Sequence, residues 1–315
     1  MSGIPLLDRR LLFVTGKGGV GKTTIAAALA VLAADQGKRV LVCEVDAKGD
    51  LADVLESGPN RFEEREVQPG VFAMSMDTEA SLKEYLRLQV RIPLLARIGP
   101  LARTFDFLAN AAPGIKEIVT VGKLAWEVKE RHYDLVVVDA AASGHIVGQL
   151  NAPQAINELV KVGLIREQTG WMLDLLRNPA TTGVVIVAAP EEMPVTESLE
   201  LIDRLVETEV DVAGIIVNRV LPELFGRTEE EVFERLRASD AAGSLDDVVG
   251  PGIGPVLEAA RLAVTLRRTR AGHLARLREG VAPGTDIVYV PELFNRTHGL
   301  RATRQVADAL AGELL

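Results

Sequence analysis

Short apolar runs alternate along the chain with longer stretches of helical character. Continuous apolar runs of this length are typical of strands that are buried on both faces of a parallel sheet. Seven runs have this character: 11–15, 39–45, 71–76, 134–139, 184–189, 212–217 and 286–290. Because helical stretches separate them, the pattern predicts an α/β fold, in which a mostly parallel twisted sheet is flanked by helices.

A glycine-rich segment follows the first predicted strand directly, where residues 16–24 read GKGGVGKTT. The segment fits the phosphate-loop pattern G-x-x-x-x-G-K-[ST], with Gly16, Gly21, Lys22 and Thr23 at the required positions. Backbone N–H groups of such a loop converge on phosphate oxygens, and the dipole of the following helix favours their negative charge. The sequence therefore predicts a P-loop NTPase fold that binds a nucleoside triphosphate.

Individual residues of this loop have separate expected roles. Lys22 brings a point charge to the outer phosphates, and the Thr23 hydroxyl can ligate Mg²⁺. The alanine-rich stretch 24–36 predicts a helix behind the loop, with Gly37 at its end. A second lysine, Lys17, follows the first glycine. We expect the nucleotide to be bound by Gly16, Lys17, Gly18, Gly19, Val20, Gly21, Lys22, Thr23 and Thr24.

Acidic residues end two of the other predicted strands. Asp46 follows the second strand, and a carboxylate there could orient a water molecule for in-line attack on the γ-phosphate. Asp139 closes the valine run 136–138, which is a Walker B signal for a carboxylate that holds Mg²⁺. We expect Lys17, Lys22, Asp46 and Asp139 to be catalytic, and Thr23, Asp46 and Asp139 to be near the metal.

Some nearby residues have two open interpretations. Asp50 and Asp53 fit helix capping or solvent exposure as well as a role in the site. His145 fits a loop histidine and a switch residue equally. Cys43 lies within an apolar run, which favours a buried strand residue over a redox or arsenic site.

Two later strand ends are candidates for the base pocket. Asn218 follows the run 212–217, and an asparagine side chain has both the donor and the acceptor that adenine recognition requires. The last predicted strand leads to Pro291 and Glu292, which could form a wall of the pocket. We therefore add Asn218, Pro291 and Glu292 to the expected nucleotide contacts.

Two stretches are too long to be plain connections between strands. Residues 79–131 are mainly helical, with breaks expected at Pro93, Pro100 and Pro113. Residues 221–280 are also mainly helical, with a Gly/Pro-rich interruption at 250–255. We expect both to be helical additions over the nucleotide face of a single domain that spans residues 1–315.

Composition narrows the classes of function. A net charge of −9 argues against a nucleic-acid partner, which would need a basic patch. Four histidines and one cysteine leave little for a metal cluster and allow no internal disulfide, which suits a cytoplasmic protein. No apolar run approaches the ~18 residues of a membrane-spanning helix, so we expect no integral membrane segment.

Together these residues resemble the ArsA-type ATPases, which include arsenite-efflux pump ATPases and tail-anchored-protein targeting factors. Lys17 to Thr23 carry the K-G-G-x-G-K-[ST] pattern of their deviant Walker A group. DAAASGH at 139–145 is similar to the family's second switch, D-T-A-P-T-G-H. Pro113-Gly114-Ile115 and the segment 190–197 look like two further family segments, and Asn218 matches the adenine-reading asparagine.

The resemblance implies ATP and Mg²⁺ as ligands and a dimer that closes on ATP and opens after hydrolysis. Lys17 would then reach across to the phosphates of the other protomer, as an arginine finger does elsewhere. The partner would be a second copy or a paralogue. In the targeting factors, closure shapes a groove for a hydrophobic, tail-anchored client, and the apolar runs 92–96 and 101–108 could line one here or pack against the core.

The chain also departs from the family pattern. The first switch reads DAKGD at 46–50, whereas the family usually has D-P-A-H-[SN], so water positioning can differ. With only Cys43, the chain can share neither a zinc ion nor arsenite through cysteines, which disfavours arsenite transport.

Three functions remain open from sequence. The first is an ATP-hydrolysing dimeric switch that handles a hydrophobic client or regulates a membrane system. The second is a positioning ATPase similar to MinD or ParA, which would need a membrane-binding C-terminal helix or a basic surface. The third is a weakly active ATP-binding subunit of a heterodimer with a paralogue.

Overall fold

The structure is a computed structural model that describes residues 4–46, 48–89, 114–160, 162–223, 226–238, 253–294 and 298–314. Pro93, Pro100 and Pro113, where we expect helix breaks, lie outside these residues, as do the apolar runs 92–96 and 101–108. Of the Gly/Pro-rich interruption at 250–255, only the last three residues are described, and they begin a helix.

A single eight-stranded sheet forms the centre of the fold, in the order β3-β4-β2-β5-β1-β6-β7-β8. The strands are β1 (Leu11–Gly16), β2 (Val40–Glu44), β3 (Arg65–Gln68), β4 (Val71–Ser75), β5 (Leu135–Asp139), β6 (Thr182–Ala188), β7 (Val212–Val220) and β8 (Ile287–Pro291). All pairings are parallel except that of β3 with β4. The seven strands predicted from the apolar runs are confirmed, and so is the mostly parallel α/β fold.

The edge strand β3 is the one strand that we did not predict. Its sequence, REVQ, contains a single apolar residue, and two of its four residues are exposed. It pairs antiparallel with β4 after a tight connection around Gly70, which has a φ of 76°. An edge strand is held by its neighbour's backbone and does not need an apolar run, so the pattern gave no signal.

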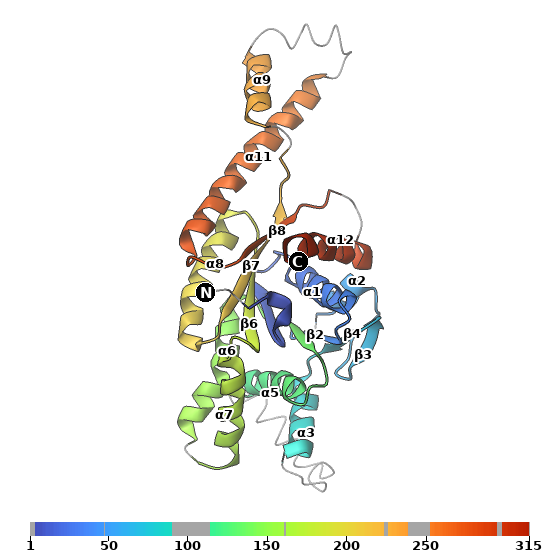
Figure 1. Ribbon diagram of the computed structural model, residues 1–315, viewed down its shortest axis with the longest axis vertical. Coiled ribbons are helices and arrows are strands. Elements are labelled where there is room, and N and C mark those ends of the chain that lie inside the picture. The colour runs from blue at the N-terminus through green and yellow to red at the C-terminus, as the bar shows by residue number, and fades with distance from the viewer. Residues whose placement is uncertain are drawn as a thin grey trace.

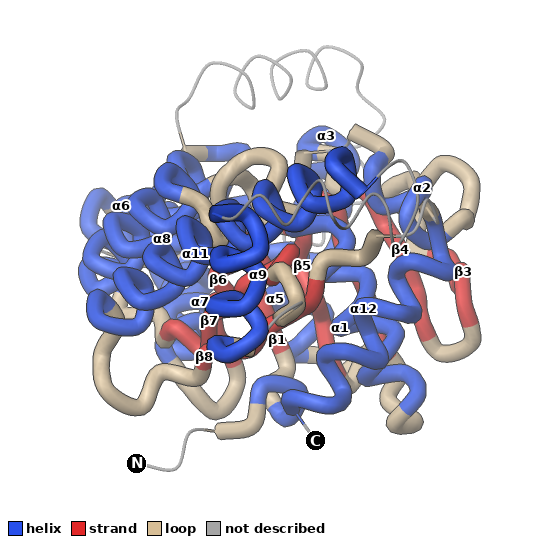
Figure 2. The backbone as a smooth tube through the Cα atoms, turned by 90° about the horizontal axis from the view of Figure 1, so that it is seen from above, coloured by secondary structure: helices blue, strands red, loops and turns tan. Residues whose placement is uncertain are grey.

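Helices cover both faces of the sheet (Figures 1 and 2). The helices are α1 (Lys22–Asp35), α2 (Asp50–Leu55), α3 (Thr78–Gln89), α5 (Ile115–Lys129), α6 (Ser143–Leu159), α7 (Leu164–Arg177), α8 (Glu192–Leu205), α9 (Arg227–Ala238), α11 (Ile253–Gly280) and α12 (Gly299–Leu314), with short 3-10 turns η1 (Leu6–Asp8) and η3 (Val206–Thr208). α1, α2 and α12 pack on one face, and α5, α6 and α8 pack on the other.

Side chains of each strand alternate between two hydrophobic cores. In β1, Leu12 and Val14 pack with α1 and α12, whereas Leu11 and Phe13 pack on the face covered by α5, α6 and α8. All four side chains are fully buried. Because both faces of β1 are covered, its sequence reads as a continuous apolar run, and the loop that follows starts from a rigid strand end.

The second predicted helical stretch forms a long arm. In Figure 1, α9 and the first half of α11 stand out together from the body of the molecule, whereas the end of α11 lies beside α8. An ion pair of 2.9 Å between Arg268 and Glu230 joins α11 to α9, and one of 3.1 Å between Arg267 and Glu223 joins α11 to the segment after β7. Near the body end of α11, Leu277 is fully buried in the core.

The C-terminal helix α12 belongs to the core. Its residues Val306, Ala307 and Leu310 are buried against α1, and Thr303 donates a hydrogen bond of 2.8 Å to the carbonyl of Val54 in α2. This apolar face is therefore covered by protein and is not available to a membrane. Among the helices that the structure describes, none is long and apolar enough to span a bilayer.

Candidate nucleotide site

The glycine-rich loop joins β1 to α1, as its position after the first apolar run predicts. Gly21 precedes α1 with a φ of 94°, and a Cβ atom there would lie 2.5 Å from Nδ2 of Asn218. Gly16 ends β1 with a φ of 148°, where a Cβ atom would lie 2.1 Å from the carbonyl oxygen of Val187. Both positions therefore require glycine, for conformation and for space.

Open space lies over the middle of the loop. Cβ atoms at Gly18 and Gly19 would meet no atom within 4 Å, and Gly19 has a φ of 85°. The backbone here is exposed at the start of a helix of 14 residues, α1, whose dipole favours an anion. This arrangement fits the phosphate-binding role expected from the sequence.

Thr23 and Asp139 meet at the start of α1. Oγ1 of Thr23 donates a hydrogen bond of 2.7 Å to Oδ2 of Asp139. β5 lies beside β1, with Val14 opposite Asp139 in the register, so the sheet itself brings the Walker B carboxylate to the loop. Two hard oxygen ligands are thus held together at a partly buried edge of the sheet, which is the chemistry that Mg²⁺ prefers.

The pKa of the Asp139 carboxyl is raised to about 6, chiefly because the group is buried. The hydrogen bond from Thr23 and the charge of Lys22 lower this pKa, whereas the negative charges of Glu44 and Asp50 raise it. A positive charge close to this carboxylate would remove part of the cost of its burial. The site thus disfavours its own negative charge and gains from a bound cation.

Lys22 is the partly buried cation of the loop. Burial lowers the pKa of its ammonium group, and the charges of Asp139, Asp46 and Asp50 oppose that effect. Its Nζ lies 3.4 Å from the carbonyl oxygen of Lys17. The carboxylates of Asp139, Asp46 and Asp50 therefore only partly compensate for the burial of the Lys22 charge.

Asp46 lies in a more exposed position than the other carboxylates. Its side chain is 43% exposed, and its Oδ2 lies 3.7 Å from Nζ of Lys48. Asp46 acts electrostatically on Lys22, so it is near the phosphate loop, whereas Thr23 donates its hydrogen bond to Asp139. Its expected role in positioning water therefore stays a prediction.

Glu44 is a site residue that we missed. It is the last residue of β2, is 3% exposed and lies opposite Asp139 in the register of β2 and β5. The sequence did carry a signal for Glu44, because it is a charged residue at the end of the apolar run Val40 to Cys43. Since the ends of parallel strands meet at one edge of the sheet, such a residue is expected to lie near Asp139.

Lys17 points away from the loop towards α8. Its Nζ forms an ion pair with Oε1 of Glu197, and Oε2 of the same glutamate accepts a hydrogen bond of 3.1 Å from Oγ of Ser143. Ser143 is the first residue of α6 and belongs to the predicted second switch. One carboxylate of α8 therefore contacts both the lysine and the switch, a link that sequence reasoning missed.

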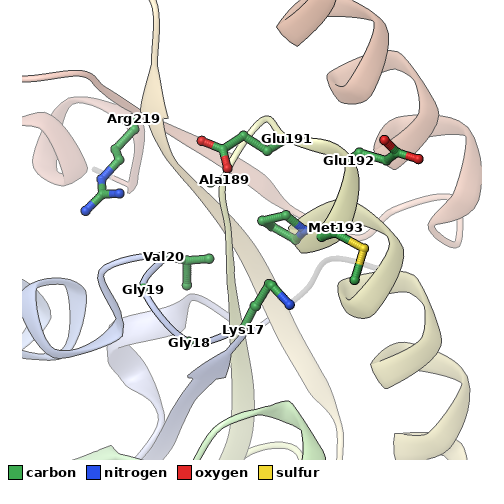
Figure 3. Close-up of a pocket in the computed structure, with 10 residues that line it drawn as sticks. Lys17, Gly18, Gly19, Val20, Ala189, Glu191, Glu192, Met193 and Arg219 are labelled. Atoms are coloured by element: carbon green, nitrogen blue, oxygen red, sulfur yellow. The ribbon is translucent and has the colours of Figure 1, made fainter.

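A cavity of about 340 Å³ opens between the loop and the start of α8 (Figure 3). Lys17 and Val20 are on one side, with Glu191, Met193 and the other residues after β6 on the opposite side. The full lining comprises Lys17, Gly18, Gly19, Val20, Ala189, Glu191, Glu192, Met193, Pro194 and Arg219. Of these, the residues from Ala189 onward were absent from the predicted contacts.

Asn218 connects the loop to β7. Its Nδ2 donates to the carbonyl of Val20 at 2.9 Å, and its Oδ1 accepts from the backbone N–H of Arg219 at 2.9 Å. Nδ2 of Asn218 has a second hydrogen to donate, and its Oδ1 has a second lone pair to accept with. Arg219 has a φ of 60°, an uncommon value outside glycine, at the rim of the cavity.

Pro291 is the last residue of β8, and Glu292 follows it, beside Arg270 of α11. The N–H of Glu292 donates to the carbonyl of Val220 at 2.9 Å, and a Glu292 oxygen lies 3.8 Å from Arg270. Neither Pro291 nor Glu292 is among the described residues that line the cavity. Their predicted contact with the base is not tested by this arrangement.

The sequence matches the family model of the anion-transporting ATPases over residues 9–174 and 164–241. The chain belongs to the anion-transporting ATPase family. This confirms the resemblance to ArsA-type ATPases and the P-loop fold class that we expected from the loop and the second switch.

Individual relatives within the anion-transporting ATPase family carry several names. The chain is 32% identical to the ATPase BagA of Mycobacterium tuberculosis over 90% of this chain and 86% of that protein. It is 28% identical to a putative arsenical pump-driving ATPase 2 of Aquifex aeolicus, over 68% of this chain and 81% of that protein. It is also 28% identical to the ATPase get3 of Schizosaccharomyces japonicus, over 67% of this chain and 74% of that protein.

Proposed function

We propose that this anion-transporting ATPase family member is a Mg²⁺-dependent ATPase that works as a dimeric switch, closing on ATP and opening after hydrolysis. The observation that carries the proposal is the group of Thr23, Asp139 and Lys22 at the start of α1. Two oxygen donors 2.7 Å apart and a partly buried lysine lie beside an open glycine loop. A triphosphate with its cation matches that set of charges and donors.

Thr23 and Asp139 would hold the Mg²⁺ ion. The raised pKa of Asp139 supports this assignment, because a bound cation would favour the charged carboxylate. When bound, the metal would neutralise charge on the outer phosphates. The loop N–H groups would orient the phosphates, and Lys22 would stabilise negative charge that moves to the leaving group.

Lys17 and Asp46 have the less local roles in this proposal. Lys17 lies on the rim of the cavity, from which a side chain could reach the phosphates of a facing protomer. Asp46 would orient the attacking water from its exposed position after β2. We propose that the partner is a second copy or a paralogue, and that a hydrophobic client or a membrane system is what the switch serves.

Two lysine variants test the assignment of roles within the loop. We expect Lys22→Ala to abolish tight ATP binding, because the charge on the outer phosphates is lost. Lys17→Ala should keep binding within about threefold but lower turnover by about 10³-fold, the lower end of what an arginine finger contributes. ATP binding by calorimetry and turnover by phosphate release are the two measurements.

The exposed Lys116 provides a matched control, since Lys116→Ala removes the same charge outside the site. Equal loss of ATP affinity in Lys17→Ala and Lys22→Ala would contradict a role for Lys17 across the dimer.

A further inference from the structure

The structure brings three distant segments together on one carboxylate. Glu197 lies on α8, Lys17 on the phosphate loop and Ser143 at the start of α6, 180 and 54 residues away along the chain. Glu197 Oε1 pairs with the lysine, and Oε2 accepts the serine hydroxyl at 3.1 Å. The side chains of Lys17 and Glu197 are 31% and 27% exposed, so the pair lies partly shielded from water.

We propose that Glu197 is a positioning residue that holds Lys17 inside its own protomer and links it to the second switch. The inference rests on the proposed function, in which Lys17 acts across the dimer. A lysine whose Nζ is bound to Glu197 cannot at the same time extend to a facing protomer's phosphates. The Lys17–Glu197 pair must therefore break before Lys17 crosses.

The hydrogen bond from Ser143 connects the Lys17–Glu197 pair to the segment that begins at Asp139. Ser143 begins α6 four residues after Asp139, so movement of the segment 139–143 changes the position of its hydroxyl. When Ser143 leaves, Glu197 loses one of the two groups that orient its carboxylate. A change in the position of Ser143 therefore alters the orientation of the Glu197 carboxylate, and with it the ion pair to Lys17.

The position of α8 supports this link. The helix is anchored by Val195, Ser198 and Leu201, which are buried, so Glu197 projects from a rigid element. The side chain of Glu197 is consequently held at a fixed place relative to the cavity that Lys17 lines. Movement is expected in the loop and the switch, and α8 supplies the fixed reference point.

The test uses the full-length protein and begins without added nucleotide. Limited acetylation with an N-hydroxysuccinimide ester, followed by peptide mass spectrometry, measures how reactive the Lys17 amine is. We expect Glu197→Gln to raise the Lys17 acetylation rate about two- to fivefold, the range for a partly exposed ion pair. Glu200→Gln, which removes the same charge from an exposed site on α8, should leave the rate unchanged.

Ser143→Ala tests the link through Glu197. It should raise the Lys17 acetylation rate by less than Glu197→Gln does, because the ion pair itself remains. In Glu197→Gln combined with Ser143→Ala, the rate should equal that of Glu197→Gln alone. Equal Lys17 acetylation in the wild type and Glu197→Gln would overturn the proposal, and so would additive effects in the double variant.

A second readout separates this inference from the proposed function. The protein concentration that gives half-maximal specific ATP turnover should fall about two- to fivefold in Glu197→Gln, since closure no longer breaks the pair. An unchanged value in Glu197→Gln, with normal concentration dependence in the wild type, would overturn the coupling to closure. Altered acetylation with no concentration dependence in the wild type would support the Lys17–Glu197 pair and contradict the dimeric switch.

Discussion

The burial of Asp139 at the candidate site lowers the stability of the folded protein when its carboxyl is charged. The residue is 7% exposed, and its neighbours include the buried carboxylate of Glu44 as well as the Thr23 hydroxyl. Because burial outweighs the favourable contacts, the pKa of Asp139 is raised from 3.8 to about 6. The folded protein therefore binds this proton more tightly than the unfolded chain does, and its stability falls as pH rises from about 4 to 6.

We accordingly predict that Asp139→Asn stabilises the fold at neutral and alkaline pH. A pKa rise from 3.8 to about 6 corresponds to a free energy on the order of 3 kcal/mol at pH 8. About half of that gain should remain near pH 5, because the wild-type carboxyl is then mostly protonated in the folded state. Thermal unfolding in EDTA without nucleotide, between pH 5 and 8, measures the difference.

An exposed carboxylate provides the comparison for this pH series. Asp35→Asn, at the end of α1, should shift the melting temperature little at any of these pH values. A lower melting temperature for Asp139→Asn than for the wild type at pH 8 would show that the charged carboxylate stabilises the fold.

Site residues that lie close together in the sequence could be predicted, whereas those that come from distant segments could not. The phosphate loop is contiguous, and Asp139 ends an apolar run, so both could be predicted from local patterns. Glu197 of α8 pairs with Lys17, and Arg219 of β7 lines the cavity, but no local spacing relates either residue to Lys17. Only the strand order places them at one edge of the sheet, and that order is set by packing of the whole chain.

Arg270 connects the arm to the site at the scale of elements. From α11 its guanidinium lies 3.3 Å from the carbonyl oxygen of Arg219, 3.8 Å from Glu292 and 3.9 Å from Glu191. Glu191 and Glu292 follow β6 and β8, and Arg219 lies near the end of β7. One side chain of α11 therefore lies close to two carboxylates and donates to the backbone of a residue that lines the cavity.

Arg270→Ala should weaken ATP binding about two- to fivefold, a range based on partly exposed ion pairs. The two glutamates would keep their negative charge near the triphosphate, and the Arg219 carbonyl would lose a donor. Arg268→Ala removes an arginine two residues away that is paired with Glu230 of α9, so it alters the arm without touching the cavity. Calorimetric titration with ATP compares the two variants, and equal affinities would contradict the connection.

Elements differed in how well the sequence revealed them. The fully buried strands β1, β2, β5 and β6 gave continuous apolar runs, and the partly buried β4, β7 and β8 were apolar enough to be found as well. β3 was missed because its sequence, REVQ, holds a single apolar residue, whereas the other edge strand, β8, has an apolar sequence and was found. The helix α11 begins inside the stretch 250–255 that we expected to be an interruption, since proline is tolerated in the first turn of a helix.

The whole molecule places its chemistry at one edge of a rigid sheet. The phosphate loop starts at the end of β1, and Asp139 and Asn218 lie at the ends of β5 and β7. The arm starts from the same edge, where Arg270 meets Arg219 and the residues that follow β6 and β8. Lys17 is the loop residue that faces α8 across the cavity (Figure 3). The chain therefore gathers Lys22, Thr23 and Asp139 at one edge of the sheet, and the proposed function requires a facing protomer beside them.

The most direct test is the specific rate of Mg²⁺-dependent ATP turnover as a function of protein concentration, from nanomolar to tens of micromolar. Our account predicts a rate per protomer that rises with concentration and then saturates, because two protomers must close before Lys17 can act. A measurable rate that is constant over the whole range would contradict it, since a single protomer would then carry out hydrolysis unaided.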